Sequence, residues 1–200
     1  MTDTRNDEHL QQQAKALFDS SVEQLDAAKT DRTKVLLFVS PDNPSGAVCP
    51  PDMVEAIGEW ALERGVWVIT DEIYEHLVYG DAVFSSMPVE VPELADRCIV
   101  VNGVAKTYAM TGWRVGWMVV PETEIRRYER LAQNLFLSCT SMSQYAALEA
   151  FSPASLEMLE QRREEFRKRR DFLLPALRDI GFRIPVTPQG AFYLYVDSSG

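Results

Sequence analysis

Lys106 is the lysine of this 200-residue chain whose neighbours in the sequence favour a role as a reactive group. It follows the apolar run 98–101 and is flanked by Ala105 and Tyr108 instead of other charges. A lysine in apolar surroundings can have a depressed pKa and can act as a nucleophile or form a Schiff base with a carbonyl group. Taken alone, Lys106 is more simply explained as an exposed loop lysine. Its interpretation therefore depends on the residues that the fold brings near it.

Other reactive side chains also follow apolar runs. Asn43 lies in a turn sequence after residues 35–40, Asp71 and Tyr74 follow residues 66–70, and Arg114 comes shortly after Lys106. Each has an ordinary structural explanation: Asn43 can belong to a turn, Asp71 can cap a helix, Tyr74 can be a core residue and Arg114 can pair with a surface acid. A functional interpretation is favoured only if one ligand or one reaction requires all of these residues together.

The pattern of elements explains how these residues could meet. The predicted strands are 35–40, 66–70, 98–101 and 115–120. The first is expected to be buried on both faces, and a helix over 50–64 ends at Gly65. Strand, helix and strand in this order predict parallel pairing and an α/β fold. Ligands of such sheets bind beyond the carboxyl ends of the strands, which is where these side chains lie.

The whole sequence is expected to form three parts. Residues 1–30 are a partly ordered lead-in with one short helix over 21–28, residues 31–152 form the sheet domain, and residues 153–200 form part of a smaller α+β domain. This last part starts with a long helix that is kinked or interrupted near Pro175, and strands are expected at 182–184 and 192–196. The charged stretch 161–170 is interpreted as a solvated helix face with local ion pairs, in preference to a basic binding patch.

Composition limits the partners. The net charge of -10 and pI near 4.7 argue against nucleic acid or an anionic membrane and favour small molecules or proteins. Cys49, Cys98 and Cys139 show no metal-binding or disulfide spacing, and they predict thiols in a reducing cytoplasm. The polar start of the chain does not resemble a secretory signal, and no transmembrane run is found in the sequence.

Four stretches together carry a family resemblance. They are Pro41-Asp42-Asn43-Pro44-Ser45-Gly46, Asp71-Glu72-Ile73-Tyr74, the run from Ala105 to Gly116, and Gln189-Gly190-Ala191-Phe192-Tyr193. In this order they resemble the class I and II aminotransferases, the fold-type-I pyridoxal-phosphate enzymes that include aspartate aminotransferase. The resemblance implies part of the cofactor-binding large domain, a mainly parallel sheet with flanking helices, followed by part of the small domain.

The resemblance also implies a role for each candidate residue. Lys106 would form the Schiff base with pyridoxal 5'-phosphate and then move the proton between the substrate α-carbon and the cofactor C4′. Asp71 would keep the pyridine nitrogen protonated, and Tyr74 and Asn43 would hydrogen-bond the phenolic oxygen. Arg114 would bind the phosphate. The implied reaction transfers an α-amino group between an amino acid and a 2-oxo acid, and full-length relatives are expected to be homodimers.

The sequence departs from the family pattern in several places. Gly103 stands where a phosphate-binding serine is common, and Ser45 replaces the commoner threonine. No counterpart of the upstream phosphate loop and ring-stacking aromatic precedes Ser21, and the downstream carboxylate-binding arginine would lie beyond Gly200. We therefore expect a chain truncated at both ends, with weak or no activity alone. A β-lyase of the same fold and a non-catalytic remnant are the alternatives.

Overall fold

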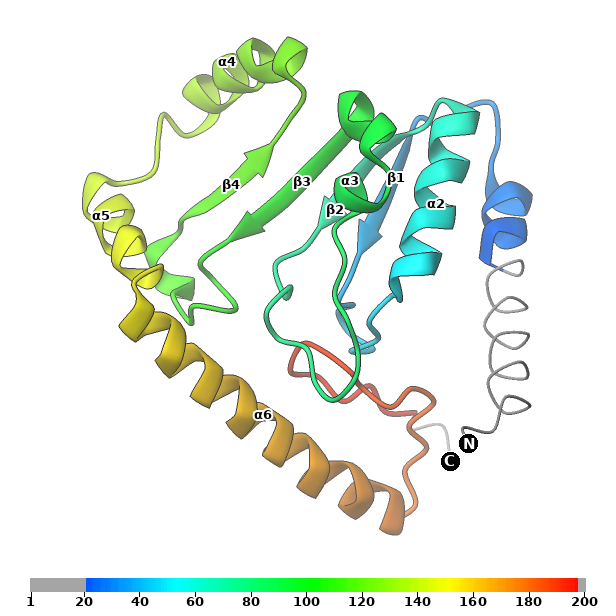
Figure 1. The fold of residues 1–200 in the computed structure, drawn as a ribbon, viewed down its shortest axis with the longest axis vertical. Helices are drawn as coiled ribbons and strands as arrows, with labels where there is room; N and C mark the ends of the chain where they lie inside the picture. The colour runs from blue at the N-terminus through cyan, green and yellow to red at the C-terminus, as the bar shows by residue number, and fades with distance from the viewer. Residues whose placement is uncertain (1–20, 198–200) are drawn as a thin grey trace, which may run out of the picture.

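One sheet, in the order β1-β2-β3-β4, organises the computed structural model, which describes residues 21–197 (Figure 1). The strands are β1 (Val35–Val39), β2 (Trp67–Asp71), β3 (Cys98–Gly103) and β4 (Gly116–Val119). The first three pair in parallel, and β4 runs antiparallel to β3. The α/β class and the mainly parallel sheet predicted from the sequence are confirmed.

Helix α2 (Pro51–Arg64) connects β1 to β2 and packs against one face of the sheet (Figure 1). It begins with a proline, whose missing N–H is not needed in the first turn. It ends at Gly65, which has a φ of 65° in the left-handed region. Its apolar face forms the largest buried cluster together with residues of β2 and the segment before β3: Val54, Ile57, Trp60, Ala61, Val66, Val68, Met87, Val91, Leu94 and Cys98.

The predicted short helix over residues 21–28 is confirmed. It is held against α2 by Asp26, whose Oδ1 accepts a hydrogen bond of 2.7 Å from Nε1 of Trp60. Arg64 adds an ion pair of 2.9 Å to the same carboxylate. Both charged side chains are partly exposed, so the ion pair adds little stability. The rest of the predicted lead-in, residues 1–20, lies outside the described residues.

Strand β1 is buried on one face only, so the expectation that both faces are buried is wrong. Leu36 and Phe38 pack against the α2 cluster, whereas Val35 is 49% exposed and Leu37 is 68% exposed. Side chains alternate between the two faces of a strand, and α2 covers only one of them. The apolar run was compatible with either arrangement because both faces carry aliphatic residues.

The other helical elements follow in chain order. They are α3 (Met87–Glu90), η1 (Pro92–Arg97), η2 (Thr111–Trp113), η3 (Glu122–Glu124), α4 (Ile125–Leu135), α5 (Ser141–Ala150) and α6 (Pro153–Asp179). Figure 1 shows α4 and α5 beyond β4, with α6 extending from α5 toward the last described residues. Within residues 21–197, no helix is both long and apolar enough to cross a membrane.

Helix α6 is continuous through Pro175, so the predicted interruption there is absent. Its first turn is capped by the Ser152 hydroxyl, which accepts a hydrogen bond of 3.3 Å from the Ser155 N–H. The predicted local ion pairs are present: Arg167 lies 2.6 Å from Glu164 and 2.8 Å from Asp171. Proline removes one hydrogen bond from a helix, and the long hydrogen-bonded run on the N-terminal side keeps α6 helical despite this loss.

The strands predicted over 182–184 and 192–196 do not form. Only isolated bridges are found among the described residues there, between Val78 and Gly190 and between Arg183 and Asp197. Ala191 has a φ of 54°, which is incompatible with an extended strand, and its N–H bonds the Leu77 carbonyl at 2.8 Å. The aromatic residues that suggested a strand pack elsewhere, as described below. The division into a large and a small domain stays a prediction.

Candidate active site at the carboxyl ends of the parallel strands

Three of the predicted site segments meet at one edge of the sheet. Asn43 follows β1, Asp71 is the last residue of β2, and Lys106 follows β3. Because β1, β2 and β3 are parallel, their carboxyl ends lie on the same side. This is the edge at which open α/β sheets bind ligands.

Tyr74 is the centre of this cluster. It is 2% exposed, and its ring makes an edge contact with Phe192 at a centroid distance of 5.4 Å. The Lys106 Nζ lies 6.0 Å from the centroid of the Tyr74 ring and 5.9 Å from that of Phe192. The ammonium group is therefore held beside two aromatic rings by cation–π attraction.

The environment of the Tyr74 hydroxyl keeps it protonated. Burial raises the pKa of Tyr74, the hydrogen bond and charge interaction with Tyr193 raise it further, and the charge of Asp71 acts in the same direction. A hydrogen bond with Asn43 opposes these effects only in part. Asn43 and Asp71, which follow neighbouring strands, therefore both act on the Tyr74 hydroxyl.

Glu72 anchors the segment that carries Asp71 and Tyr74. It is 4% exposed, and its Oε1 accepts hydrogen bonds from the Thr70 hydroxyl at 3.0 Å and the Ser86 hydroxyl at 2.9 Å. Burial raises the pKa of Glu72, and these hydrogen bonds offset the effect only partly. The side chain ties the end of β2 to the start of α3, so that the Asp71 backbone is fixed from the side opposite the cluster.

A second anchor joins this segment to β3. The Asn102 Nδ2 donates a hydrogen bond of 2.8 Å to Oε1 of Glu75. Asn102 also accepts a bond of 2.7 Å from the Gly103 N–H through its Oδ1. The Asp71 carboxylate accepts from the Ile73 N–H at 3.1 Å. These bonds fix the loop after β2 relative to the strand that leads to Lys106.

The loop that carries Asn43 is joined to residues 188–190. The Gly46 carbonyl accepts hydrogen bonds from the N–H groups of Gln189 at 2.8 Å and Gly190 at 2.9 Å. Gly46 has a φ of 72°, and a Cβ there would lie 2.5 Å from the Pro188 Cβ. Two of the stretches that carry the family resemblance are therefore in direct contact, although they lie at opposite ends of the described chain.

A cavity of about 410 Å³ opens beside Lys106. Its volume is in the range of small-molecule sites. One wall comes from the connection between β3 and β4, and the opposite wall comes from α6. The lining residues are Leu77, Ala105, Lys106, Thr107, Ala109, Thr111, Arg162, Glu165, Phe166, Arg169 and Phe192.

Thr107 lines the cavity and carries a buried hydroxyl group without a partner among the described residues. Thr107 is 8% exposed, and within residues 21–197 its Oγ1 is the buried side-chain oxygen or nitrogen without a hydrogen-bond partner. Leaving a buried hydroxyl unpaired is unfavourable, and a ligand oxygen could satisfy it. Thr107 was not predicted as a site residue, because its position next to Lys106 gave no indication that its hydroxyl is buried.

The arginines on the α6 wall were also missed. Arg162 and Arg169 fall in the charged stretch interpreted as a solvated face. With Phe166 they follow helical spacing, which places all three on one side of α6 and on the wall of the cavity. This helical spacing was the sequence pattern from which their common position on one side of α6 could have been predicted. Arg169 pairs with Glu165 at 3.2 Å, so its charge is partly compensated.

Arg114 lies at the margin of this site. Its side chain is exposed, its φ is 56°, and its Nη1 donates a hydrogen bond of 3.0 Å to the Thr111 carbonyl. Thr111 lines the cavity, whereas Arg114 does not. The structure thus brings Asn43, Asp71, Tyr74 and Lys106 together, and it leaves Arg114 exposed at the margin of the cavity, next to the lining residue Thr111.

Gly103 has a structural reason for being glycine. A Cβ at this position would lie 2.9 Å from the Val115 carbonyl oxygen and 3.0 Å from the Gly116 Cα. A serine would therefore require β4 to move. The Gly103 N–H is already bonded to Asn102, so it is not available to a phosphate group in this conformation.

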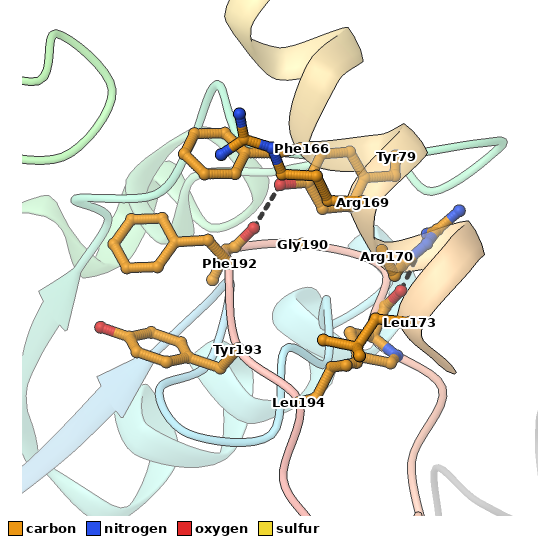
Figure 2. Close-up of a pocket in the computed structure, with 11 residues that line it drawn as sticks. Tyr79, Phe166, Arg169, Arg170, Leu173, Gly190, Phe192, Tyr193 and Leu194 are labelled. Atoms are coloured by element: carbon orange, nitrogen blue, oxygen red, sulfur yellow. Dashed lines mark hydrogen bonds between the residues drawn. The ribbon is translucent and has the colours of Figure 1, made fainter. Parts of the chain in front are cut away.

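A smaller cavity of about 220 Å³ adjoins the first one, and Figure 2 shows it between α6 and residues 188–194. Phe166, Arg169 and Phe192 line both cavities and form the wall between them. The Tyr79 hydroxyl donates to the Ala191 carbonyl, and Arg170 Nη1 donates to the Pro188 carbonyl at 2.9 Å. These two hydrogen bonds hold the segment that contains Phe192 against α6.

The sheet and the cluster define an α/β protein with an enzyme-like site at the carboxyl ends of its parallel strands. Residues 9–200 match the family described as aminotransferase class I and II, and the chain belongs to this family.

Individual relatives agree with this assignment. The aspartate aminotransferase of Streptomyces avermitilis is 56% identical over 175 residues, which cover 88% of this chain and 43% of the relative. That of Geobacillus stearothermophilus is 40% identical, with 89% and 45% covered. A Thermus thermophilus aspartate aminotransferase structure has a TM-score of 0.82 at 40% identity, with 89% and 46% covered. The chain thus spans a little under half the length of the relatives it matches.

Proposed function

We propose that the protein to which this chain belongs transfers α-amino groups between amino acids and 2-oxo acids with pyridoxal 5'-phosphate as cofactor, attached through Lys106. The observation that carries the proposal is the meeting of Asn43, Asp71, Tyr74 and Lys106 at one edge of the sheet in a member of the aminotransferase family. The names of the relatives make aspartate the first amino donor to test.

The residues present fit the cofactor. When bound, pyridoxal 5'-phosphate accepts the electrons left on the substrate α-carbon after its proton departs. Asp71 would pair with the pyridine nitrogen, and Asn43 and Tyr74 would face the phenolic oxygen. The unpaired Thr107 hydroxyl supports a polar ligand in the cavity beside Lys106. Arg114 would hold the phosphate with the part of its guanidinium that does not bond Thr111.

The chain's own groups suggest how each would act. The Lys106 amine would take a proton from the substrate α-carbon and deliver it to the cofactor C4′. Because the pKa of Tyr74 is raised, its phenol stays protonated and donates a hydrogen bond to an oxygen acceptor. The aromatic rings of Tyr74 and Phe192 would flank the Lys106 amine beside the cavity.

The proposal for the 200 residues alone is more limited. They span a little under half of each relative, so we propose weak cofactor binding and slow or no turnover unless the rest of the fold is supplied. A homodimer is proposed for the complete protein, and a cytoplasmic location is proposed because Cys49, Cys98 and Cys139 are free thiols.

Trapping with borohydride tests the proposal. The chain is incubated with pyridoxal 5'-phosphate, reduced with borohydride, digested and analysed by mass spectrometry. We expect the pyridoxyl group on Lys106, and its loss in Lys106→Ala. Label confined to the exposed lysines, or spread equally among all of them, would contradict the assignment. Product analysis with aspartate and 2-oxoglutarate tests the reaction type, since glutamate and oxaloacetate are expected from amino transfer. In a separate incubation with cysteine, whose β-thiol can leave, release of ammonia, pyruvate and hydrogen sulfide would instead indicate β-elimination.

A further inference from the structure

Helix α6 is joined to the segment after β2 by Arg163. The Nη1 of Arg163 donates a hydrogen bond of 2.6 Å to the Val78 carbonyl. The Arg163 side chain is 28% exposed, and its Nε donates a second hydrogen bond of 2.9 Å to Glu160 on the same helix. Arg163 therefore connects α6 to the stretch of chain that begins with Tyr74.

The Val78 carbonyl can accept this bond because of the way its segment pairs. Val78 and Gly190 form an antiparallel bridge, and backbone hydrogen bonds of 2.7 and 2.8 Å between residues 77–79 and 189–191 flank it on both sides. The two central residues of such a pair do not bond each other, so their own N–H and C=O groups point outward. The Val78 carbonyl therefore needs a donor from outside the bridge, and Arg163 supplies it.

The same side of α6 carries two further contacts with these paired segments. The Phe166 ring stacks on the Phe192 ring at a centroid distance of 5.6 Å (Figure 2). Arg170 bonds the Pro188 carbonyl. Arg163, Phe166 and Arg170 follow the i, i+3, i+7 spacing of one helix face. One arginine thus binds each of the two paired segments, and Phe166 lies between the arginines on α6.

Helix α6 has few buried residues to fix its position. They are Leu159 and Leu174, which come before and after the stretch 163–170. A helix with little buried apolar surface opens locally at a low free-energy cost, unless specific contacts hold it to its neighbours. Between Leu159 and Leu174, the contacts of Arg163, Phe166 and Arg170 are therefore expected to determine where α6 lies.

We propose that Arg163 is a positioning residue of the candidate site, because it holds α6 and Phe192 in place beside the Lys106 amine. The Lys106 Nζ lies 5.9 Å from the centroid of the Phe192 ring, and Phe192 in turn stacks on Phe166. Arg163 fixes α6 about one turn before Phe166. The importance of Arg163 for amino transfer rests on the proposed function, whereas its effect on the surroundings of Lys106 does not.

Loss of the guanidinium group should be felt at Lys106. The Val78 carbonyl then bonds water, and α6 is released at this point. Phe166 and Phe192 separate more often, so the cavity wall that they form with α6 opens. The Lys106 amine, which lines the same cavity, becomes more accessible to a reagent in solution.

The test measures the reactivity of Lys106 in the 200-residue chain without cofactor. The chain is acetylated briefly with an N-hydroxysuccinimide ester, and peptide mass spectrometry gives the rates for Lys106 and for Lys29. Lys29 is half-buried, so loosening of the whole chain raises its rate as well. We expect the ratio of the Lys106 rate to the Lys29 rate to rise about fivefold in Arg163→Gln, the effect of losing one hydrogen bond.

Arg167→Gln is the matched control. Arg167, like Arg163, pairs with the glutamate three positions before it, but its further bond goes to Asp171 on the same helix. Both glutamine variants lose a charge and an ion pair of α6, so both can lower stability. Only Arg163→Gln is expected to change the ratio. Arg163→Lys keeps the charge and can donate one hydrogen bond, so it should give a smaller rise.

The outcomes separate this proposal from the proposed function. Circular dichroism shows which variants are folded, and Arg163→Lys decides the question if Arg163→Gln unfolds. An unchanged ratio in the folded Arg163 variants, or an equal rise in Arg167→Gln, would overturn the positioning role. Failure of the borohydride trapping at Lys106 in the unmodified chain would overturn the proposed function and leave the comparison of acetylation rates intact.

Discussion

The hydroxyl groups of Tyr74 and Tyr193 lie 2.7 Å apart, although the two residues are 119 positions apart in the sequence. Tyr74 follows β2 and is buried, whereas Tyr193 belongs to the segment held against α6. Their contact links the electrostatics of the candidate site to the position of that segment. A change at Tyr193 should therefore be measurable at Tyr74.

Replacing Tyr193 with phenylalanine should lower the pKa of Tyr74. The hydrogen bond and the charge interaction with Tyr193 both raise this pKa, and the substitution removes both while burial remains. Titration of the chain labelled with 13C at the tyrosine ζ carbon would measure the change. Tyr195→Phe is the matched control, because Tyr195 belongs to the same segment and its side chain is 55% exposed. An unchanged Tyr74 titration in Tyr193→Phe would show that the contact is absent in solution.

Glu72→Gln should remove one component of the pH dependence of stability. The pKa of Glu72 is raised in the folded chain, chiefly by burial, so its contribution is fully present below the ordinary glutamate range. It is lost as the pH rises through the raised pKa, and each unit of pKa difference corresponds to about 1.4 kcal/mol. Urea unfolding between pH 4 and 8, chosen to span about the ordinary glutamate range and above, should show a decline that Glu72→Gln lacks. The exposed Glu93→Gln serves as control.

Thr107→Val should stabilise the cofactor-free chain by about 1 kcal/mol, because it removes a buried hydroxyl that has no partner and keeps the side-chain shape. Thr107→Ser keeps the hydroxyl and loses a methyl group, so it should be less stable than the original chain. Denaturant midpoints would rank the three proteins. If Thr107→Val were the least stable, the hydroxyl must have a partner in solution.

Gly46→Ala should destabilise the chain more than Gly80→Ala. Both glycines have positive φ values, 72° and 66°, so alanine costs each about 1 kcal/mol in backbone conformation. At Gly46 a Cβ would also lie 2.5 Å from the Pro188 Cβ, whereas nothing lies within 4 Å at Gly80. Overpacking of this kind adds about 1 to 3 kcal/mol. If thermal unfolding showed equal losses of stability in the two variants, Pro188 would have to move away from the added Cβ at little energetic cost.

Much of the fold was predictable from local pattern. The positions of the four strands and of α2 follow from apolar runs and from residues such as Pro51 and Gly65, whose backbone preferences act locally, whereas the short helical segments α3, η1 and η2 were not predicted. The carboxyl-edge position of Asn43, Asp71 and Lys106 then followed from parallel pairing. The sequence could not show which side chains of β1 are buried. Leu37 and Phe38 are both apolar, and only the packing of α2 distinguishes them.

The errors arose where tertiary contacts override local preference. Phe192 and Tyr193 favour a strand, but the Ala191 bond to Leu77 fixes a turn, and the aromatic rings then pack on Tyr74. The position of α6 on the wall of the cavity could not be predicted, for a similar reason. Nothing in the charged sequence shows that Arg162 faces Lys106 across a cavity, because that depends on the path of the chain after β4.

The joining of Gly46 to Gln189 and Gly190 determines when the site can form during synthesis. A ribosome delivers the amino-terminal part of the chain first, so the Asn43 loop emerges long before residues 188–190, to which it is joined. The loop can take up its final position only after residues 188–190 have been released. A nascent chain that stalls before Gly190 can already contain the sheet and Lys106. It lacks the contact that fixes the position of the loop that carries Asn43. Assembly of the site is therefore a late event in translation.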